Sequence, residues 1–358
     1  MEATPTRSRF PEAVGLKTLD ADGIARLVES LDQPRYRAAQ IVRWVYGRGA
    51  RSYDQMTDVP TGLRAQLADR FALPFPSVLE RQVSSDGTRK YLIRLADGAT
   101  VECVGLPAMD RLTVCFSTQA GCAMGCSFCA TGASGLTRDL APGEMLDQVR
   151  LVGDDFGARV SNAVAMGQGE PFANYEPTLG ALRLMNSPDG LEIGARHLTV
   201  STCGLIAGIE RFTEEPEQFT LAVSLHSAVQ TTRDALMPGV RGQTLTRLRG
   251  ALERYSEATG RRPSLEFALV EGANDTDDEL RALISFCQGL LVHVNLIPMN
   301  AVAGTGHGRA PGARVDEFAR RLDAAGVNAT VRTERGADID AACGQLRQRA
   351  AADESAPR

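Results

Sequence analysis

Short apolar runs alternate with segments of helical spacing from about residue 111 to residue 332. The apolar runs predict strands at 112–116, 160–166, 197–200, 219–225, 264–270, 290–297 and 327–331. Apolar residues at helical spacing predict the helices between them, at 144–156, 176–185, 205–212, 245–258, 277–287 and 315–325. Such alternation is typical of parallel βαβ units, and its length predicts an α/β fold that forms a (β/α) barrel or part of one.

The residues before this repeat follow two other patterns. Helical spacing recurs at 20–31, 35–47 and 52–71 and predicts a small N-terminal helical domain over 1–75. Three short strands are then predicted at 77–83, 90–95 and 100–104, with Asp-Gly turns between them. We therefore expect a β-hairpin linker region at 76–108, the main domain at 109–346 and a C-terminal tail at 347–358.

Three cysteines within eight residues, Cys122, Cys126 and Cys129, are the main candidate for metal chemistry. Thiolates suit iron–sulfur clusters or zinc. A four-iron cluster normally takes four cysteines, so three leave one iron open for a small molecule, as in radical S-adenosylmethionine (SAM) enzymes. A zinc site needs a fourth ligand, and the sequence has no further cysteine or histidine at zinc-finger spacing from these three. The pattern favours the open cluster, and a remote fourth ligand keeps zinc as the alternative.

Composition bounds the setting of this chemistry. The chain has 358 residues, 43% of them hydrophobic, without an apolar run of membrane-spanning length, and we expect no secretory signal. Eight cysteines, three of them bunched, indicate cytoplasmic metal and redox chemistry rather than disulfides. The net charge of −5 counts mildly against a nucleic-acid partner. Residues 1–51 nevertheless hold nine Lys or Arg and six Asp or Glu, and residues 35–51 mix arginines with Trp and Tyr. That segment is an RNA-contact candidate, although composition favours a helix with buried aromatic residues.

Polar residues share one position in the strand–helix repeat. The carboxyl ends of the strands carry the active site in a β/α barrel. The residues at or soon after the ends of predicted strands are Gly169, Glu170, Ser201, Ser224, Leu225, His226, Asn300 and Cys343. Each residue alone is weak evidence for a site; a lone histidine, for example, is more often structural than a ligand. Their shared phase predicts that they meet at one rim with the cysteine loop.

The chain resembles the RlmN/Cfr family of radical SAM RNA methyltransferases over nearly its whole length. The matching segments are 111–132, 166–175, 194–202, 222–226, 293–298 and 336–346, together with 36–41 and 54–57 in the helical accessory domain. The segment Ala-Ala-Cys-Gly-Gln-Leu around Cys343 is more specific than the cysteine motif. The resemblance implies a radical SAM partial (β/α) barrel with a small N-terminal helical domain.

The resemblance also implies the roles of individual residues. Cys122, Cys126 and Cys129 would hold a 4Fe–4S cluster, and SAM would be held by Gly169, Glu170, Ser201, Ser224, Leu225, His226 and Asn300. Two SAM molecules would be used, the first to methylate Cys343 to S-methylcysteine. Glu102 would accept the ring proton, and Cys115 would release the methylated RNA through a transient disulfide with Cys343. Cys103, Cys203 and Cys287 are expected to be ordinary buried cysteines.

The implied substrate is C2 of an adenosine in 23S ribosomal RNA, together with an adenosine in the tRNA anticodon loop. Gly169-Glu170-Pro171 with Asn174-Tyr175 resembles the C2 group, whereas Gln168 and Cys203 depart from the family pattern. The alternatives are Cfr-like methylation at C8, a radical SAM enzyme acting on a non-RNA substrate, and a zinc-stabilised RNA-binding module without catalysis. We expect a cytoplasmic monomer with an electron donor such as flavodoxin or ferredoxin and no membrane partner.

Overall fold

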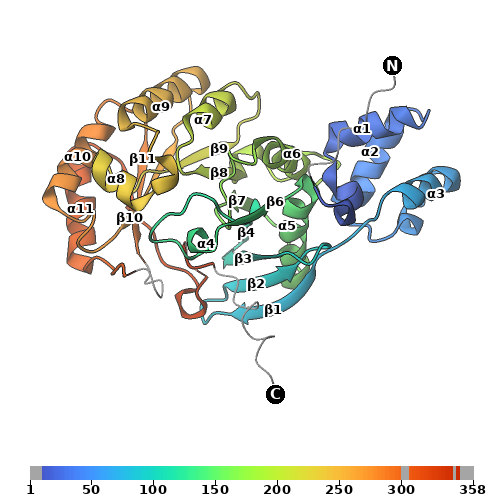
Figure 1. Ribbon diagram of the computed structural model, residues 1–358, viewed down its shortest axis with the longest axis horizontal. Coiled ribbons are helices and arrows are strands. Elements are labelled where there is room, and N and C mark those ends of the chain that lie inside the picture. Colours follow the sequence, from blue (N-terminus) through green and yellow to red (C-terminus); the bar gives the residue numbers. More distant parts are fainter. Residues whose placement is uncertain (1–9, 300–305, 342–343, 347–358) are drawn as a thin grey trace.

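The computed structural model describes residues 10–299, 306–341 and 344–346. Within them, one ten-stranded sheet runs in the order β1-β2-β3-β4-β7-β8-β9-β10-β11-β12 (Figure 1). Its strands are β1 (Ser77–Val83), β2 (Arg89–Arg94), β3 (Thr100–Ala108), β4 (Arg111–Cys115), β7 (Asn162–Ala165), β8 (Leu198–Thr202), β9 (Thr220–Ser224), β10 (Ser264–Leu269), β11 (His293–Pro298) and β12 (Ala329–Val331). A second sheet pairs β5 (Gln119–Gly121) with β6 (Leu136–Asp139).

The sheet is parallel from β4 to β12, and helices connect most of its successive strands. These helices are α5 (Pro142–Phe156), α6 (Tyr175–Asn186), α7 (Ile206–Thr213), α8 (Gln230–Leu236), α9 (Leu245–Thr259), α10 (Asp277–Cys287) and α11 (Gly312–Ala324). Figure 1 shows α7, α9, α10 and α11 around the outside of the curved sheet. The predicted α/β class with βαβ alternation is confirmed. In the described residues the sheet is open, so the barrel is partial.

The strands predicted at 77–104 form an antiparallel wing of the same sheet. β1, β2, β3 and β4 pair antiparallel in sequence order, with Val104 of β3 opposite Cys115 of β4. β4 then pairs in parallel with β7. This register places the end of β3 beside the beginning of the strand–helix repeat.

Helix ends follow local capping chemistry. The side chain of Thr276 accepts a hydrogen bond from the backbone N–H of Glu279 at the start of α10, whose first turn is acidic. α5 begins with Pro142 and is capped after Phe156 by Gly157, which has the left-handed φ of 60° that favours glycine. The short α4 (Ala130–Ala133) follows the cysteine loop directly.

The N-terminal helices pack against the part of the chain that forms the large sheet. They are α1 (Ala21–Ser30), α2 (Tyr36–Val42), which continues into a π-helical turn at Arg43–Gly47, and α3 (Thr61–Arg70). Their apolar residues belong to the same contiguous core as the sheet. Tyr46 is fully buried there, whereas Tyr36 is 59% exposed. No helix in the described ranges has the length and apolar character needed to cross a membrane.

Candidate active site

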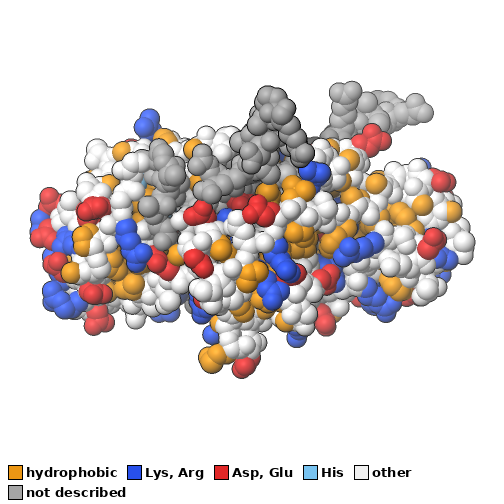
Figure 2. Space-filling model, turned by 90° about the horizontal axis from the view of Figure 1, so that it is seen from below, with side chains coloured by type: hydrophobic (Ala, Val, Ile, Leu, Met, Phe, Trp, Pro, Cys, Tyr) orange, Lys and Arg blue, Asp and Glu red, His pale blue; other side chains and the backbone are white. Residues whose placement is uncertain are grey.

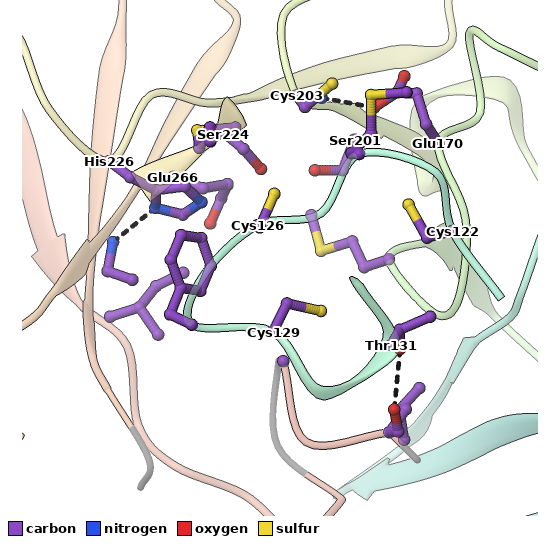
Figure 3. A pocket seen from close by; sticks show the side chains of 18 of the residues that line it. Cys122, Cys126, Cys129, Thr131, Glu170, Ser201, Cys203, Ser224, His226 and Glu266 are labelled. Carbon is purple, nitrogen blue, oxygen red and sulfur yellow. Dashed lines mark hydrogen bonds between the residues drawn. The ribbon is translucent and has the colours of Figure 1, made fainter. Parts of the chain in front are cut away.

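A cavity lies at the carboxyl ends of the parallel strands (Figure 3). Five successive strands, β7 to β11, each contribute a residue from their last two positions to its wall. These residues are Ala165, Ser201, Ser224, Ala268 and Ile297. The opposite wall is the cysteine loop between β5 and β6. The strand ends thus converge on one rim, as the sequence pattern predicted.

The three cysteines of the loop point their sulfur atoms toward this cavity (Figure 3). Two backbone hydrogen bonds shape the loop: Cys122 N–H donates to the Gly135 carbonyl at 2.8 Å, and Cys129 N–H to the Cys126 carbonyl at 3.0 Å. Gly121 precedes the loop with a φ of 79°, and a Cβ there would lie 2.0 Å from the Gly135 carbonyl oxygen. The entry to the loop therefore requires glycine.

Burial controls the protonation of these thiols. It raises the pKa of Cys122 to about 11, and it also raises the pKa of Cys126. Both are thus neutral thiols at pH ~7 until a metal displaces their protons. Metal binding in this loop is therefore coupled to proton release.

Glu170 braces the next loop along the rim. Its two carboxylate oxygens accept backbone hydrogen bonds, Oε1 from Phe172 at 3.0 Å and Oε2 from Cys203 at 2.7 Å. Burial raises its pKa. Gly169 beside it has a φ of 104°, and a Cβ there would lie 2.6 Å from the Gln119 side chain. Glu170 therefore joins the loops that follow β7 and β8, and Gly169 packs closely against Gln119 of β5.

His226 is held as a neutral ring. Its Nδ1 accepts the backbone N–H of Ala268 at 2.9 Å, so the remaining ring proton belongs to Nε2. Burial, and after it the charge of Arg233, lowers its pKa to about 3. The ring lies edge-on to Phe128, with centroids 4.8 Å apart. His226 is therefore suited to donate a hydrogen bond from Nε2 and to stay uncharged.

The candidate SAM residues divide into three groups. Those that line the cavity are Gly169, Glu170, Ser201, Ser224 and His226. Leu225 does not: its side chain is fully buried in the core, and its backbone N–H donates to the Glu266 carbonyl at 3.0 Å. Asn300 lies outside the described residues, as does Cys343. Gly344, directly after Cys343, lines the cavity and accepts the Ala130 N–H at 2.8 Å.

Cys115 lines a second pocket that adjoins the first. The residues common to both walls are Met166, Ile297, Arg332 and Leu346. Val104 of β3 also lines the second pocket, and Glu102 shares its face of the strand because side chains alternate. Glu102 is buried, with Oε1 3.7 Å from Lys90 Nζ. Glu102 itself lines neither pocket.

Comparisons with known proteins agree with this arrangement. Residues 14–73 match the ribosomal RNA large subunit methyltransferase N-terminal domain, and residues 116–287 match the radical SAM superfamily. The chain is 44% identical over 342 residues to the probable dual-specificity RNA methyltransferase RlmN of Symbiobacterium thermophilum, covering 94% of this chain and 91% of that protein. The chain belongs to the RlmN family of radical SAM methyltransferases.

Two further relatives support membership of the RlmN family. The protein of the same name from Pelotomaculum thermopropionicum is also 44% identical, covering 95% of this chain and 93% of its own length. The crystal structure of a radical SAM methyltransferase from Sphaerobacter thermophilus superposes with a TM-score of 0.86 at 44% identity. That alignment covers 93% of this chain and 98% of the other. The shared fold therefore includes both the N-terminal helices and the catalytic sheet.

Membership of the RlmN family implies an iron–sulfur cluster and SAM, and the donor set fits the cluster. Each thiolate of a cubane cluster binds a different iron, so its sulfur atoms need not converge on one point. The three thiols face one cavity. In the described ranges, however, no three His, Cys, Asp or Glu side chains converge to hold a single metal ion. The three thiols that face the cavity fit the donor set of the cluster that membership of the RlmN family implies.

The cavity wall contains functional candidates that the sequence reasoning did not single out. Glu266 is 3% exposed, accepts the Asn295 amide at 2.8 Å on Oε1, and has Oε2 3.8 Å from Arg332 Nη1. The sequence feature that could have identified Glu266 is an acidic residue standing alone within the apolar run of β10. Arg332 directly follows β12, in the phase that the other rim residues share. Cys203 is buried as expected, but it also lines the cavity beside Glu170.

The segment that precedes Cys343 is fastened to the turn between β1 and β2. Asp86 Oδ2 accepts the Gly336 N–H at 3.2 Å, and Asp338 Oδ2 accepts the Ser85 N–H at 3.1 Å. Lys90 Nζ donates to the Asp340 carbonyl at 3.2 Å. The antiparallel wing therefore anchors the chain on one side of residues 342–343, and the start of α4 anchors it on the other.

Proposed function

We propose that the protein methylates C2 of an adenosine in 23S ribosomal RNA, and of an adenosine in the tRNA anticodon loop. The observation that carries this proposal is the adjacency of two pockets. One is lined by Cys122, Cys126 and Cys129, and the other by Cys115, with wall residues in common. The name of the relatives, dual-specificity RNA methyltransferase, supports two classes of RNA substrate.

The first pocket is suited to the cofactors. Cys122, Cys126 and Cys129 would hold the cluster, and Ser201, Ser224 and His226 would bind SAM through short polar groups. When bound, the reduced cluster and SAM supply the radical that an electron-poor ring carbon needs, because such a carbon does not attack a methyl group as a nucleophile. Glu170 keeps its loop in place through the two backbone hydrogen bonds that it accepts.

The second pocket is suited to the thiol chemistry. Cys343 would carry the methyl group as S-methylcysteine, and Cys115 would attack its sulfur to release the product. The two flanks of residues 342–343 support this pairing, since Gly344 lines the first pocket and Ala341 the second. Attack requires Cys115 as a thiolate with access to its partner sulfur. Glu102, on the same face of β3 as the second-pocket residue Val104, would accept the ring proton.

The RNA would reach the site across a surface of mixed charge. On the face drawn in Figure 2, Lys and Arg side chains are interspersed with Asp and Glu. The N-terminal helices add two stacked pairs of arginine and aromatic side chains. The guanidinium of Arg37 lies 4.7 Å from the Tyr36 ring centroid, and that of Arg48 lies 4.3 Å from Trp44. Such groups can contact phosphates and stack on unpaired bases. Flavodoxin or ferredoxin would supply the electron.

Mass spectrometry of ribosomal and transfer RNA tests the substrate. The RNA would come from a strain lacking the gene, with and without a plasmid copy. Return of 2-methyladenosine with the plasmid is the expected outcome. Return of 8-methyladenosine would replace C2 by the C8 alternative. RNA that is identical in the two strains would refute RNA methylation.

A Cys115→Ala variant tests the thiol roles. Without a resolving thiol, the link between Cys343 and the RNA should persist, and a protein–RNA adduct should migrate slowly on a denaturing gel. Cys287→Ala is the matched control, since Cys287 is a buried cysteine on α10 that lines neither pocket. Absence of the adduct in Cys115→Ala, with SAM cleavage intact, would exclude the resolving role.

A further inference from the structure

The cysteine loop rests on α8 and the turn that follows it, a segment that no predicted element covered. Ser127 N–H donates to the Leu236 carbonyl at 2.9 Å, and Gly239 N–H donates to the Met124 carbonyl at 2.9 Å. A Cβ on Gly239 would lie 2.6 Å from that same carbonyl oxygen, so the two backbones are in direct contact. Cys126 also packs against the buried apolar residues of this segment. A charged side chain on α8 therefore lies close to the loop that carries the cluster ligands.

α8 carries a guanidinium that is fully buried. Arg233 has 0% exposure, and Nη2 donates to the Cys203 carbonyl at 2.7 Å. In the described part of the chain, Nε and Nη1 have no hydrogen-bond partner, and the Asp234 carboxylate, next to Arg233 on α8, acts on its charge without forming an ion pair with it. A buried cation without a counter-charge is costly, so this position calls for an anion.

The residues around Arg233 leave room for its guanidinium and interact with its charge. Gly204 has a φ of 95°, and a Cβ there would lie 2.9 Å from Arg233 Nη2, so the glycine leaves room for the guanidinium. The groups that act on Arg233 electrostatically are the Cys203 and Cys126 thiols and Asp234. Its charge also contributes to the low pKa of His226 on the cavity wall. The positive field of Arg233 therefore reaches both a cluster cysteine and the cavity.

We propose that Arg233 is the buried counter-charge of the iron–sulfur cluster and makes the cluster easier to reduce. This inference rests on the proposed function, because it assumes a cluster on Cys122, Cys126 and Cys129. Thiolate ligands give such a cluster a net negative charge, and reduction by one electron from the donor protein adds to it. A fixed cation nearby stabilises the reduced form more than the oxidised form, which raises the potential. Arg233 itself keeps its proton and exchanges no electron.

A purely structural role for Arg233 makes a different prediction. If its only task were to hold the Cys203 carbonyl, any substitution that loses this hydrogen-bond geometry would act alike, whatever its charge. Arg233→Lys keeps the positive charge but loses the planar fork, and Arg233→Met loses both. The two variants therefore separate charge from bracing.

The experiment uses full-length protein, reconstituted anaerobically, without SAM or RNA. The midpoint potential is measured by redox titration, with the electron paramagnetic resonance signal of the reduced cluster as readout. We expect a more negative potential for Arg233→Met and a value near that of the unchanged protein for Arg233→Lys. Arg254→Met, at a side chain that is 57% exposed on α9, is the control and should change nothing. An unchanged potential in Arg233→Met at full iron content would overturn the proposal, and so would equal shifts in both variants.

Iron content covers the case in which Arg233→Met does not retain a cluster. Retention in Arg233→Lys with loss in Arg233→Met supports the counter-charge role, whereas loss in both overturns it. Failure of the unchanged protein to bind iron and sulfide would instead refute the proposed function. The two failures are therefore distinguishable in one set of samples.

Discussion

Removal of the Lys17 amino group should loosen the attachment of the N-terminal helices. Lys17 Nζ lies 2.7 Å from Asp147 Oδ1 of α5, and the two side chains are 1% and 3% exposed. The amino group also lies 5.6 Å from the ring centroid of Tyr46, in the π-helical turn after α2. Gly143 on α5 leaves the space for this packing, since a Cβ there would lie 2.8 Å from the Lys17 side chain. This buried ion pair thus joins the segment before α1 to α5, which belongs to the strand–helix repeat.

The size of the effect follows from the burial of the pair. Lys17→Met keeps most of the side-chain volume but leaves the Asp147 carboxylate buried without its partner. Breaking a buried pair in this way costs about 3–5 kcal/mol. We expect the lower end, because the charge of Arg150 also acts on Asp147 and remains in the variant. The double variant Lys17→Met/Asp147→Leu should recover most of that loss, since well-packed apolar pairs often replace buried ion pairs at little cost.

Urea unfolding followed by circular dichroism measures these differences, with RNA and SAM absent. The single variant should unfold at clearly lower urea, and the double variant close to the unchanged protein. A single variant within about 1 kcal/mol of the unchanged protein would refute the reasoning, because that is the value of an exposed pair. A double variant less stable than the single one would refute it equally.

The same variant has a predicted pH dependence. Burial raises the pKa of Asp147, and Lys17 is the largest influence that lowers it. Without Lys17 the folded-state pKa rises further above the unfolded value of about 4. A carboxyl with a raised folded pKa takes up a proton on folding, so its effect on stability worsens as pH increases through that range. The deficit of Lys17→Met should therefore be smaller at pH ~4 than at pH ~7, and an equal deficit at both would contradict this.

Three further variants test the site and its surroundings. Gly169→Ala places a Cβ 2.6 Å from the side chain of a glutamine, on a backbone with a φ of 104°. We expect SAM binding, measured by calorimetry, to weaken by about 1–3 kcal/mol. Gly62→Ala is the control, because a Cβ at Gly62 meets no atom within 4 Å. Asp86→Ala removes the acceptor of the Gly336 amide, which should then exchange hydrogen several-fold faster by mass spectrometry, and unchanged exchange would remove the proposed anchor. Tyr36→Ala should weaken RNA binding in a filter assay by about 1–3 kcal/mol if the exposed ring stacks on a base, and unchanged affinity would exclude that contact.

The sequence predicted the architecture where apolar periodicity was strong. The runs that became β8, β9 and β10 and the helical segments that became α9 and α10 agree closely with the structure. α8 was not predicted because Leu236 and Arg233 are the buried side chains on this short helix, and one of them is charged. β5 and β6 were not predicted because strands of three and four residues are too short to show an alternation of apolar and polar side chains. Pairing of the hairpin strands with β4 depends on register, which apolar spacing does not encode.

The site was predictable to the extent that topology fixes it. Parallel strands bring their carboxyl ends to one edge, so phase in the repeat predicted that Ser201, Ser224 and His226 would meet. Leu225 points away because successive side chains alternate in direction along and just after a strand. The partners of Glu170 could not be predicted, since Cys203 donates from a loop 33 residues later. Such contacts arise from the packing of loops, which leaves no periodic trace.

Charge is the property of the cavity that the sequence conceals most. Glu170, Glu266 and the three cysteines line it, which makes the wall acidic once the thiols are deprotonated. Arg332 reaches the same wall but lies 3.8 Å from Glu266, which offsets its charge. A cavity of this kind favours a cationic ligand, as the sulfonium and amino groups of SAM require. The acidic wall also offsets the part of the Arg233 field that reaches the cavity, and Arg233 itself lies outside the cavity lining.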